Sequence, residues 1–124
     1  MSLKIETHGD ITRIDQNARR SRAVAGGGIL CTAGQVADSL GADITTQARE
    51  AFAKIDQLLA EAGTDKTRVL SIQIWLTDLA DYDAFNAVWD AWIVPGQSPA
   101  RHCAKVELAN PGYRVELIAT ACLP

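Results

Sequence analysis

The stretch SPARHCAKVELANPGYRVELIATACLP, residues 98–124, predicts two β-strands on either side of an Asn-Pro-Gly turn. Apolar and polar residues alternate in both halves, as they do in strands with one buried face. Arg101 and Glu116 lie inside these alternating runs, where a guanidinium and a carboxylate need a partner or a ligand. Both the fold and the function of the chain depend on where these two charged side chains point.

A hairpin register predicts which of these side chains meet. If the turn centres on Asn110-Pro111, Leu108 pairs with Tyr113. In that register Arg101, Cys103 and Glu116 share one face of the two strands. The other face is apolar and is expected to meet helices; it carries Val106, Leu108, Val115, Leu117 and Ala119.

The same register offers a purely structural explanation for part of the charge. Lys105 lies opposite Glu116 in it, and Glu107 likewise lies opposite Arg114. Each cross-strand ion pair would stabilise the hairpin by roughly 0.2–1 kcal/mol. Arg101 has no charged residue opposite it, and an arginine in that position suits a ligand carboxylate. Glu116 is therefore either a functional group or half of an ion pair.

Upstream of the first helix, three strands are predicted in residues 11–15, 22–28 and 29–36. The three glycines at 26–28 indicate a hairpin, because glycine adopts positive φ without strain. They do not indicate a phosphate-binding loop, because no GxxxxGK motif follows them.

Two amphipathic helices follow from the 3.6-residue period. Asp43 is the predicted N-cap of the first helix, Gly63 ends it, and Gln47 lies among the polar residues off its apolar stripe. That stripe consists of Ala48, Phe52, Ile55, Leu59 and Ala62. The second helix runs from Asp81 to Ile93, and its predicted buried stripe is Tyr82, Phe85, Trp89 and Trp92.

Residues 68–78 alternate as a strand between the two helices. One predicted face carries Leu70, Ile72, Ile74 and Leu76, and the other carries Ser71, Gln73, Trp75 and Thr77. The mixed face with an indole suits a subunit interface. The order β-β-β-α-β-α-β-β predicts a single α+β domain over residues 1–124, with both helices on one face of a mixed sheet. The uncovered face predicts a closed homo-oligomer.

Composition argues against several other classes of protein. The net charge of −3 does not favour binding to nucleic-acid backbones, and no apolar run reaches the ~20 residues of a membrane span. The N-terminal residues lack the apolar core of a secretory signal, so a cytoplasmic location is expected. Three cysteines without CxxC spacing and only two histidines favour neither a metal site nor a disulfide framework.

The motifs SPARHCAKVEL and RVELIATA resemble the signature of the Rid family of enamine/imine deaminases, also called the YjgF family. The likeness extends in order through ILCTAGQVAD, TQAREAFAKIDQLLAEAG, VLSIQIWLTDLADY and FNAVWDAW, and covers nearly the whole chain. The resemblance implies a chorismate-mutase-like fold and a homotrimer whose sheets line a central barrel, with three clefts between the subunits. It implies no need for a metal or an organic cofactor.

The resemblance also implies roles for individual residues. Arg101 matches the arginine that binds the substrate carboxylate, and Glu116 matches the glutamate that positions or activates the attacking water. Cys103 matches a frequent pocket cysteine that is not a nucleophile. Gly34 matches a glycine whose backbone borders the substrate, and Asn86 matches a helix asparagine near the cleft.

Two departures from the family pattern bear on the substrate. Ala33 stands where a serine is frequent, and Arg20 or a neighbour stands where an aromatic residue is usual. The added charge of Arg19, Arg20 and Arg22 would favour a larger or more acidic ligand, unless these side chains are simply solvated in a loop.

The expected activity is hydrolytic deamination of reactive 2-enamino or 2-imino acids to 2-keto acids and ammonia. The alternative is a trimer that binds a small carboxylate, such as a 2-keto acid, without turnover. Ribonuclease activity, with which some family members are labelled, fits least, because the chain is acidic and lacks a paired His/Lys set. A Cys103 nucleophile is also disfavoured, because strand alternation sends the adjacent His102 to the opposite face.

Overall fold

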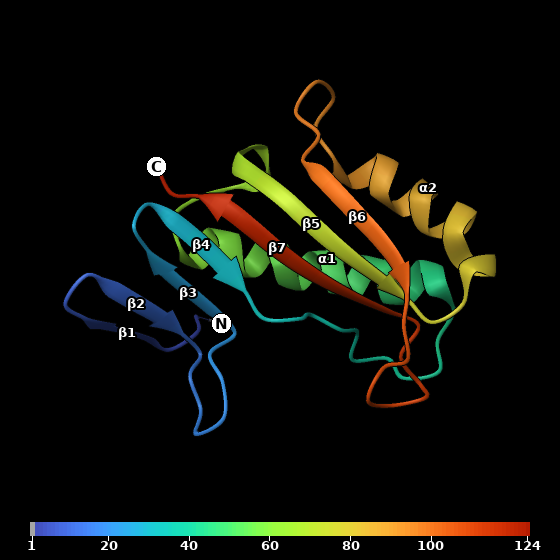
Figure 1. The fold of residues 1–124 in the computed structure, drawn as a ribbon, viewed down its shortest axis with the longest axis horizontal. Coiled ribbons are helices and arrows are strands. Elements are labelled where there is room, and N and C mark those ends of the chain that lie inside the picture. The colour runs from blue at the N-terminus through green and yellow to red at the C-terminus, as the bar shows by residue number, and fades with distance from the viewer. Residues whose placement is uncertain (1) are drawn as a thin grey trace.

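The computed structural model describes residues 2–124 as one seven-stranded mixed sheet with two helices on one face (Figure 1). The elements are β1 (Ile5–His8), β2 (Ile11–Ile14), β3 (Ala23–Gly26), β4 (Ile29–Thr32), α1 (Ile44–Glu61), β5 (Val69–Leu76), α2 (Tyr82–Trp92), β6 (Ala100–Lys105) and β7 (Val115–Cys122). Short 3-10 turns, η1 (Lys66–Arg68) and η2 (Leu79–Asp81), precede β5 and α2. The predicted α+β class is confirmed, with one strand, β1, more than predicted before α1.

The strand order β1-β2-β3-β4-β7-β5-β6 contradicts the predicted hairpin of the last two strands. β6 pairs in parallel with β5, and β7 pairs antiparallel with β5 on the other side, so β5 lies between them. The β5–α2–β6 connection is a crossover, which places β6 beside β5 in parallel. Residues 106–114 then form a loop that carries the chain past the end of β5, rather than a tight hairpin turn.

The observed register also separates the charges that the hairpin would have put on one face. Arg101 pairs with Ile72, which is fully buried on the helix side, and Cys103 follows on the same face. Glu116 pairs with Trp75, whose neighbours in β5 point into the core, so Glu116 lies on the open side. The prediction that Arg101, Cys103 and Glu116 share a face is therefore wrong.

The strand β5 carries a register irregularity that the alternation did not predict. The pairing with β7 shifts between Val69 and Ser71, so an extra residue, Leu70, is accommodated there. Leu70 is 48% exposed, whereas Val69 is buried. The core does receive Ile72, Ile74 and Leu76, as predicted. The prediction that Leu70 also faces the core is wrong.

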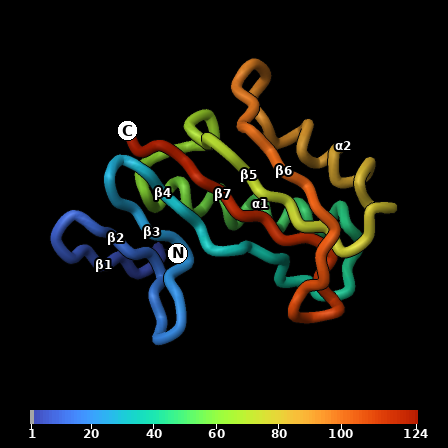
Figure 2. Tube along the Cα trace, in the orientation of Figure 1, coloured from blue at the N-terminus to red at the C-terminus, as the bar shows by residue number. Residues whose placement is uncertain are grey.

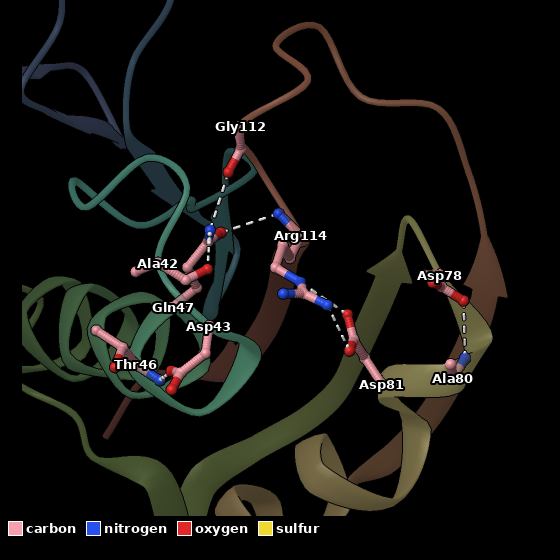
Figure 3. A network of polar contacts seen from close by, with 9 residues as sticks. All are labelled: Ala42, Asp43, Thr46, Gln47, Asp78, Ala80, Asp81, Gly112 and Arg114. Carbon is pink, nitrogen blue, oxygen red and sulfur yellow. Dashed lines mark hydrogen bonds and ion pairs between the residues drawn. The ribbon is translucent and has the colours of Figure 1, made fainter.

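The ends of α1 agree with the prediction. The Asp43 side chain accepts a hydrogen bond from the Thr46 amide at 2.8 Å, and Gly63, with φ +78°, follows the helix. Gln47, predicted off the apolar stripe, is instead fully buried. Its side-chain amide reaches the backbone just before β7, a contact shown in Figure 3.

The helix α2 packs its aromatic side chains against α1 and the sheet. Phe85, Trp89 and Trp92 are buried as predicted, and the Phe52 ring stacks on Trp92 with centroids 4.6 Å apart. Tyr82 was predicted to be buried with them, but it is 42% exposed. It stands in the first turn of α2, where its ring reaches the guanidinium of Arg101 in the edge strand rather than the core.

Within residues 2–124, no helix covers the opposite face of the sheet (Figure 1). This open face carries half-buried or exposed side chains from β5 and β7, namely Ser71, Gln73, Trp75, Glu116, Ile118 and Thr120. An uncovered face of mixed polarity was predicted from the alternation of β5 and is confirmed. No helix within residues 2–124 is both long and apolar enough to span a lipid bilayer.

Candidate functional site

All of the predicted site residues except Arg20 lie in two groups of one chain, together with contacting residues that were not predicted. The first, the arginine cluster, joins β6 to α2 and consists of Arg101, Cys103, Tyr82, Asn86 and Trp89. The second, the glutamate cluster, joins β7 to the segment after β4 and consists of Glu116, Ala33, Gly34, Gln35 and Arg22. The sheet separates the two groups, because Arg101 lies on its helix face and Glu116 on its open face.

In the arginine cluster, α2 holds the guanidinium of Arg101 from one side. Arg101 Nη2 donates a hydrogen bond of 2.8 Å to Asn86 Oδ1 and a longer one of 3.4 Å to the Tyr82 hydroxyl. The guanidinium carbon lies 4.8 Å from the centroid of the Trp89 ring and 5.8 Å from that of Tyr82. Both distances fall within the range of a cation–π interaction.

The spacing of these residues explains why they meet. Tyr82, Asn86 and Trp89 lie at positions i, i+4 and i+7 of α2 and therefore share one face of the helix. Asn86 was predicted to lie near the cleft, and its hydrogen bond places it beside Arg101. Trp89 and Tyr82 were predicted only as core residues, although the same spacing places them with Asn86.

Cys103 lies two residues beyond Arg101 on the same face of β6. Burial raises the pKa of its thiol, and the positive charge of Arg101 offsets part of that effect. The raised pKa favours the thiol over the thiolate, which is the more nucleophilic form. Its neighbour His102 points to the opposite face, as predicted.

In the glutamate cluster, Gly34 leaves room for the carboxylate of Glu116. A Cβ atom at Gly34 would collide with Glu116 Oε2, so only glycine allows this close approach. Burial raises the pKa of Glu116. Within residues 2–124 Glu116 makes no ion pair, and Lys105 lies on the other face of the sheet, so the predicted Lys105–Glu116 pair is wrong. Arg114 pairs with Asp81 instead of Glu107.

A chain of polar contacts holds the backbone beside Glu116. The backbone of Gln35 exchanges hydrogen bonds of 2.8 and 3.0 Å with Leu117. Gln35 Nε2 donates to the Ala33 carbonyl at 3.0 Å, and Gln35 Oε1 accepts from Arg22 Nη2 at 2.9 Å. Arg22 also lies 3.8 Å from the Asp15 carboxylate. Arg22 is thus part of the support for this segment and not a solvated loop residue.

Arg20 does not reach either cluster in a single chain. It is exposed, and its Nη1 donates to the Asp15 carbonyl at 2.8 Å, so the side chain folds back on its own loop. That loop joins β2 to β3, whereas β6 forms the opposite edge of the sheet (Figure 2). An Arg20 contact with a ligand held by Arg101 would therefore need a second chain.

Two cavities of the single chain also lie away from these clusters. One, of about 300 Å³, lies between α1 and α2 around Phe52 and Trp92. The other, of about 600 Å³, is formed by the loop between β6 and β7 and includes Lys105 and Tyr113. Neither is lined by Arg101 or Glu116.

Comparison with known proteins agrees with the fold described above. The model of a family described as Endoribonuclease L-PSP matches residues 10–123. A RutC family protein from Haemophilus ducreyi is 38% identical over 113 residues, which cover 91% of this chain and 97% of that protein. The crystal structure of a YjgF family member from Neisseria meningitidis superimposes with a TM-score of 0.90 at 39% identity, covering 95% of this chain and 98% of that one.

A more distant relative has a named activity. The 3-aminoacrylate deaminase RutC of Acinetobacter baylyi is 34% identical over 79 residues, which cover 64% of this chain and 62% of that protein. Its name describes the deamination of 3-aminoacrylate, an enamine that carries a carboxylate.

Proposed function

The chain belongs to the Endoribonuclease L-PSP family, the family of the YjgF and RutC proteins, and on this premise we propose that it deaminates 2-imino and 2-enamino acids. The products would be a 2-keto acid and ammonia. The observation that carries the proposal is the guanidinium of Arg101, which α2 holds in place through the neutral side chains of Asn86 and Trp89. Such an arginine suits a substrate carboxylate. The name of the Acinetobacter baylyi relative supports the deamination of an enamine that carries a carboxylate, in its case one with the amino group on C3.

The proposed active site lies between two copies of the chain. Arg101 and Glu116 lie on opposite faces of one sheet, so they act on one substrate only if they come from different subunits. The open face, with half-buried Trp75, gives a surface that further copies would cover. In the proposed homotrimer, the arginine cluster of one subunit faces the glutamate cluster of the next. The loop that carries Arg20 would border the same cleft.

The proposed reaction is a direct addition of water. Arg101 binds the carboxylate of the 2-imino acid and fixes the position of its C=N carbon, which lowers the entropic part of the barrier. Glu116 accepts a proton from a water molecule as its oxygen bonds to that carbon, and the proton passes to the nitrogen. The hydroxyl group of the resulting carbinolamine then gives its proton to the nitrogen through Glu116, the C–N bond breaks as the C=O bond forms, and ammonia leaves the 2-keto acid. Cys103 takes no proton in this scheme.

The first test follows the hydrolysis of freshly generated 2-iminopropionate by the formation of pyruvate. The wild-type protein is expected to accelerate the reaction, and Arg101→Ala is expected to lower that acceleration by about 100-fold, because the substrate loses its orientation. Arg101→Lys, which keeps the charge without the planar fork, is expected to recover part of the rate. The absence of any acceleration by the wild type, with this and other imino acids, would exclude the deaminase.

The second candidate is a trimer that binds a small carboxylate without turnover, and Arg101 supports it equally well. Titration calorimetry with pyruvate separates the two, since a binding protein would bind pyruvate tightly but leave the imine to hydrolyse at its spontaneous rate. The family description names an endoribonuclease, but the net charge of −3 does not favour binding to the negatively charged backbone of RNA. Cleavage of single-stranded RNA in the same preparation would overturn that view.

A further inference from the structure

The contacts that hold Arg101 are all with uncharged groups. Asn86 Oδ1 and the Tyr82 hydroxyl accept from Nη2, and the rings of Trp89 and Tyr82 lie against the guanidinium. Within residues 2–124, no carboxylate forms an ion pair with Arg101. The side chain is thus oriented while it keeps its whole positive charge.

Two nitrogen atoms of the guanidinium remain available as donors to a ligand. Both protein acceptors are bound by Nη2, and Nε and Nη1 donate no hydrogen bond within the described part of the chain. Nε–H and the N–H groups of Nη1 lie on different sides of the guanidinium, because Cδ stands between them, and each of the two can still donate to a ligand carboxylate. Trp89 is 4% exposed, so its ring is fixed by the core and cannot move away from Arg101 easily.

We propose that Trp89 and Asn86 are positioning residues for carboxylate recognition, which hold Arg101 without neutralising it and leave its Nε and Nη1 donors free for the ligand. This inference rests on the proposed function in taking Arg101 as the carboxylate anchor. It adds that the affinity for the carboxylate is set by α2, through a neutral amide and an indole. An acidic residue in place of Asn86 would satisfy the same Nη2 donor but would compete with the ligand for the charge.

The decisive variant is Asn86→Asp, which changes the shape of the side chain very little. It is expected to keep the contact with Arg101 and to weaken pyruvate binding by about 10-fold or more, because the guanidinium then has a carboxylate partner. Trp89→Leu is expected to weaken pyruvate binding by about 3–30-fold through the loss of the cation–π contact. With 2-iminopropionate, both variants are expected to raise KM and to change kcat little, since the contact acts on binding.

Trp92→Phe is the matched control. Trp92 is also a buried indole of α2, but it stacks on Phe52 and donates to Asp56 rather than contacting Arg101. Its replacement is expected to lower the melting temperature and to leave the pyruvate affinity and KM unchanged. If Trp89 only stabilised the fold, Trp89→Leu would likewise lower the melting temperature and leave the pyruvate affinity and KM unchanged.

Pyruvate binding also separates this inference from the proposed function. If the wild type binds pyruvate but hydrolyses no imine, and Asn86→Asp weakens that binding, the positioning role stands and the deaminase fails. If Asn86→Asp and Trp89→Leu bind pyruvate as tightly as the wild type, the positioning role is overturned whatever the activity. A wild type that binds no pyruvate in calorimetry at millimolar concentration would overturn it as well, since Arg101 would not be a carboxylate anchor.

Discussion

Glu116→Gln is expected to lower the rate of imine hydrolysis by about 10²–10⁴-fold, the usual contribution of a general acid–base residue. Glutamine keeps the size of the side chain, and so the fit against Gly34, but it cannot accept a proton from water. The measurement is kcat for 2-iminopropionate by stopped-flow detection of pyruvate. A variant that keeps more than about a tenth of the wild-type kcat would show that Glu116 does not act as the base.

The pH dependence of kcat and of stability provides a second test of Glu116. Burial raises the pKa of Glu116, and a general base must be ionised, so kcat is expected to rise with pH through this raised pKa and then to level off. The linkage to folding has the opposite sign. The raised pKa favours the fold below the ordinary pKa of glutamate, and this contribution is lost as the pH rises through the raised pKa. Glu116→Gln is therefore expected to melt at a higher temperature than the wild type at neutral pH.

Oligomers that mix two variants test whether the proposed site takes Arg101 and Glu116 from different subunits. Arg101→Ala and Glu116→Gln subunits are each expected to be nearly inactive alone, but a mixed form of the proposed trimer would contain one interface in three with an intact arginine and an intact glutamate. Co-expression of the two variants is therefore expected to restore activity well above that of either variant alone. If Arg101 and Glu116 served the same substrate from one chain, every site in the mixture would lack one of them and no activity would return.

Gln47→Leu is expected to destabilise the protein by about 2–4 kcal/mol, because the part-buried Ala42 carbonyl and Arg114 amide would lose their partner and the Gly112 carbonyl would keep only the Gly41 amide. Gln47 Nε2 donates to the carbonyls of Ala42 and Gly112 at 3.0 and 2.9 Å, and its Oε1 accepts from the Arg114 amide at 2.9 Å (Figure 3). Leucine fills a similar volume but satisfies none of these groups. The expected fall in melting temperature is about 10 °C or more at fixed protein concentration.

The control for Gln47→Leu is Lys54→Ala on the same helix. Lys54 lies 2.7 Å from the Asp38 carboxylate, but Asp38 is highly exposed, so the loss is expected to be below about 1 kcal/mol. Equal melting temperatures for the two variants would contradict the importance assigned to the buried amide. The comparison also bears on the site, because the Gln47 contacts hold the backbone two residues before Glu116.

A neighbouring ion pair joins the same region to α2. Arg114 Nε and Nη2 donate to the two carboxylate oxygens of Asp81 at 3.0 and 2.8 Å, and Asp81 is 7% exposed (Figure 3). Arg114 precedes Glu116 in β7, and Asp81 precedes the first turn of α2. One bidentate pair thus connects the segments that carry the glutamate cluster and the arginine cluster.

Much of this protein was predictable from its sequence, because helix caps, hydrophobic periodicity and short motifs act over a few residues. The N-cap at Asp43, the buried residues of α1, the uncovered face of β5 and the family all followed from local pattern. Arg101 and Asn86 were both named as site residues, and their hydrogen bond brings them together.

Only the tertiary structure decided how these pieces meet. A strand pattern does not say which strand is its neighbour, and β5 lies between β6 and β7, so the sides of Arg101 and Glu116 were predicted wrongly. The burial of Gln47 and the exposure of Tyr82 depend on partners 65 and 19 residues away in the chain, which no local period records. The sequence by itself determined which residues carry the chemistry, whereas the order of strands in the sheet decided that one chain holds them on opposite faces.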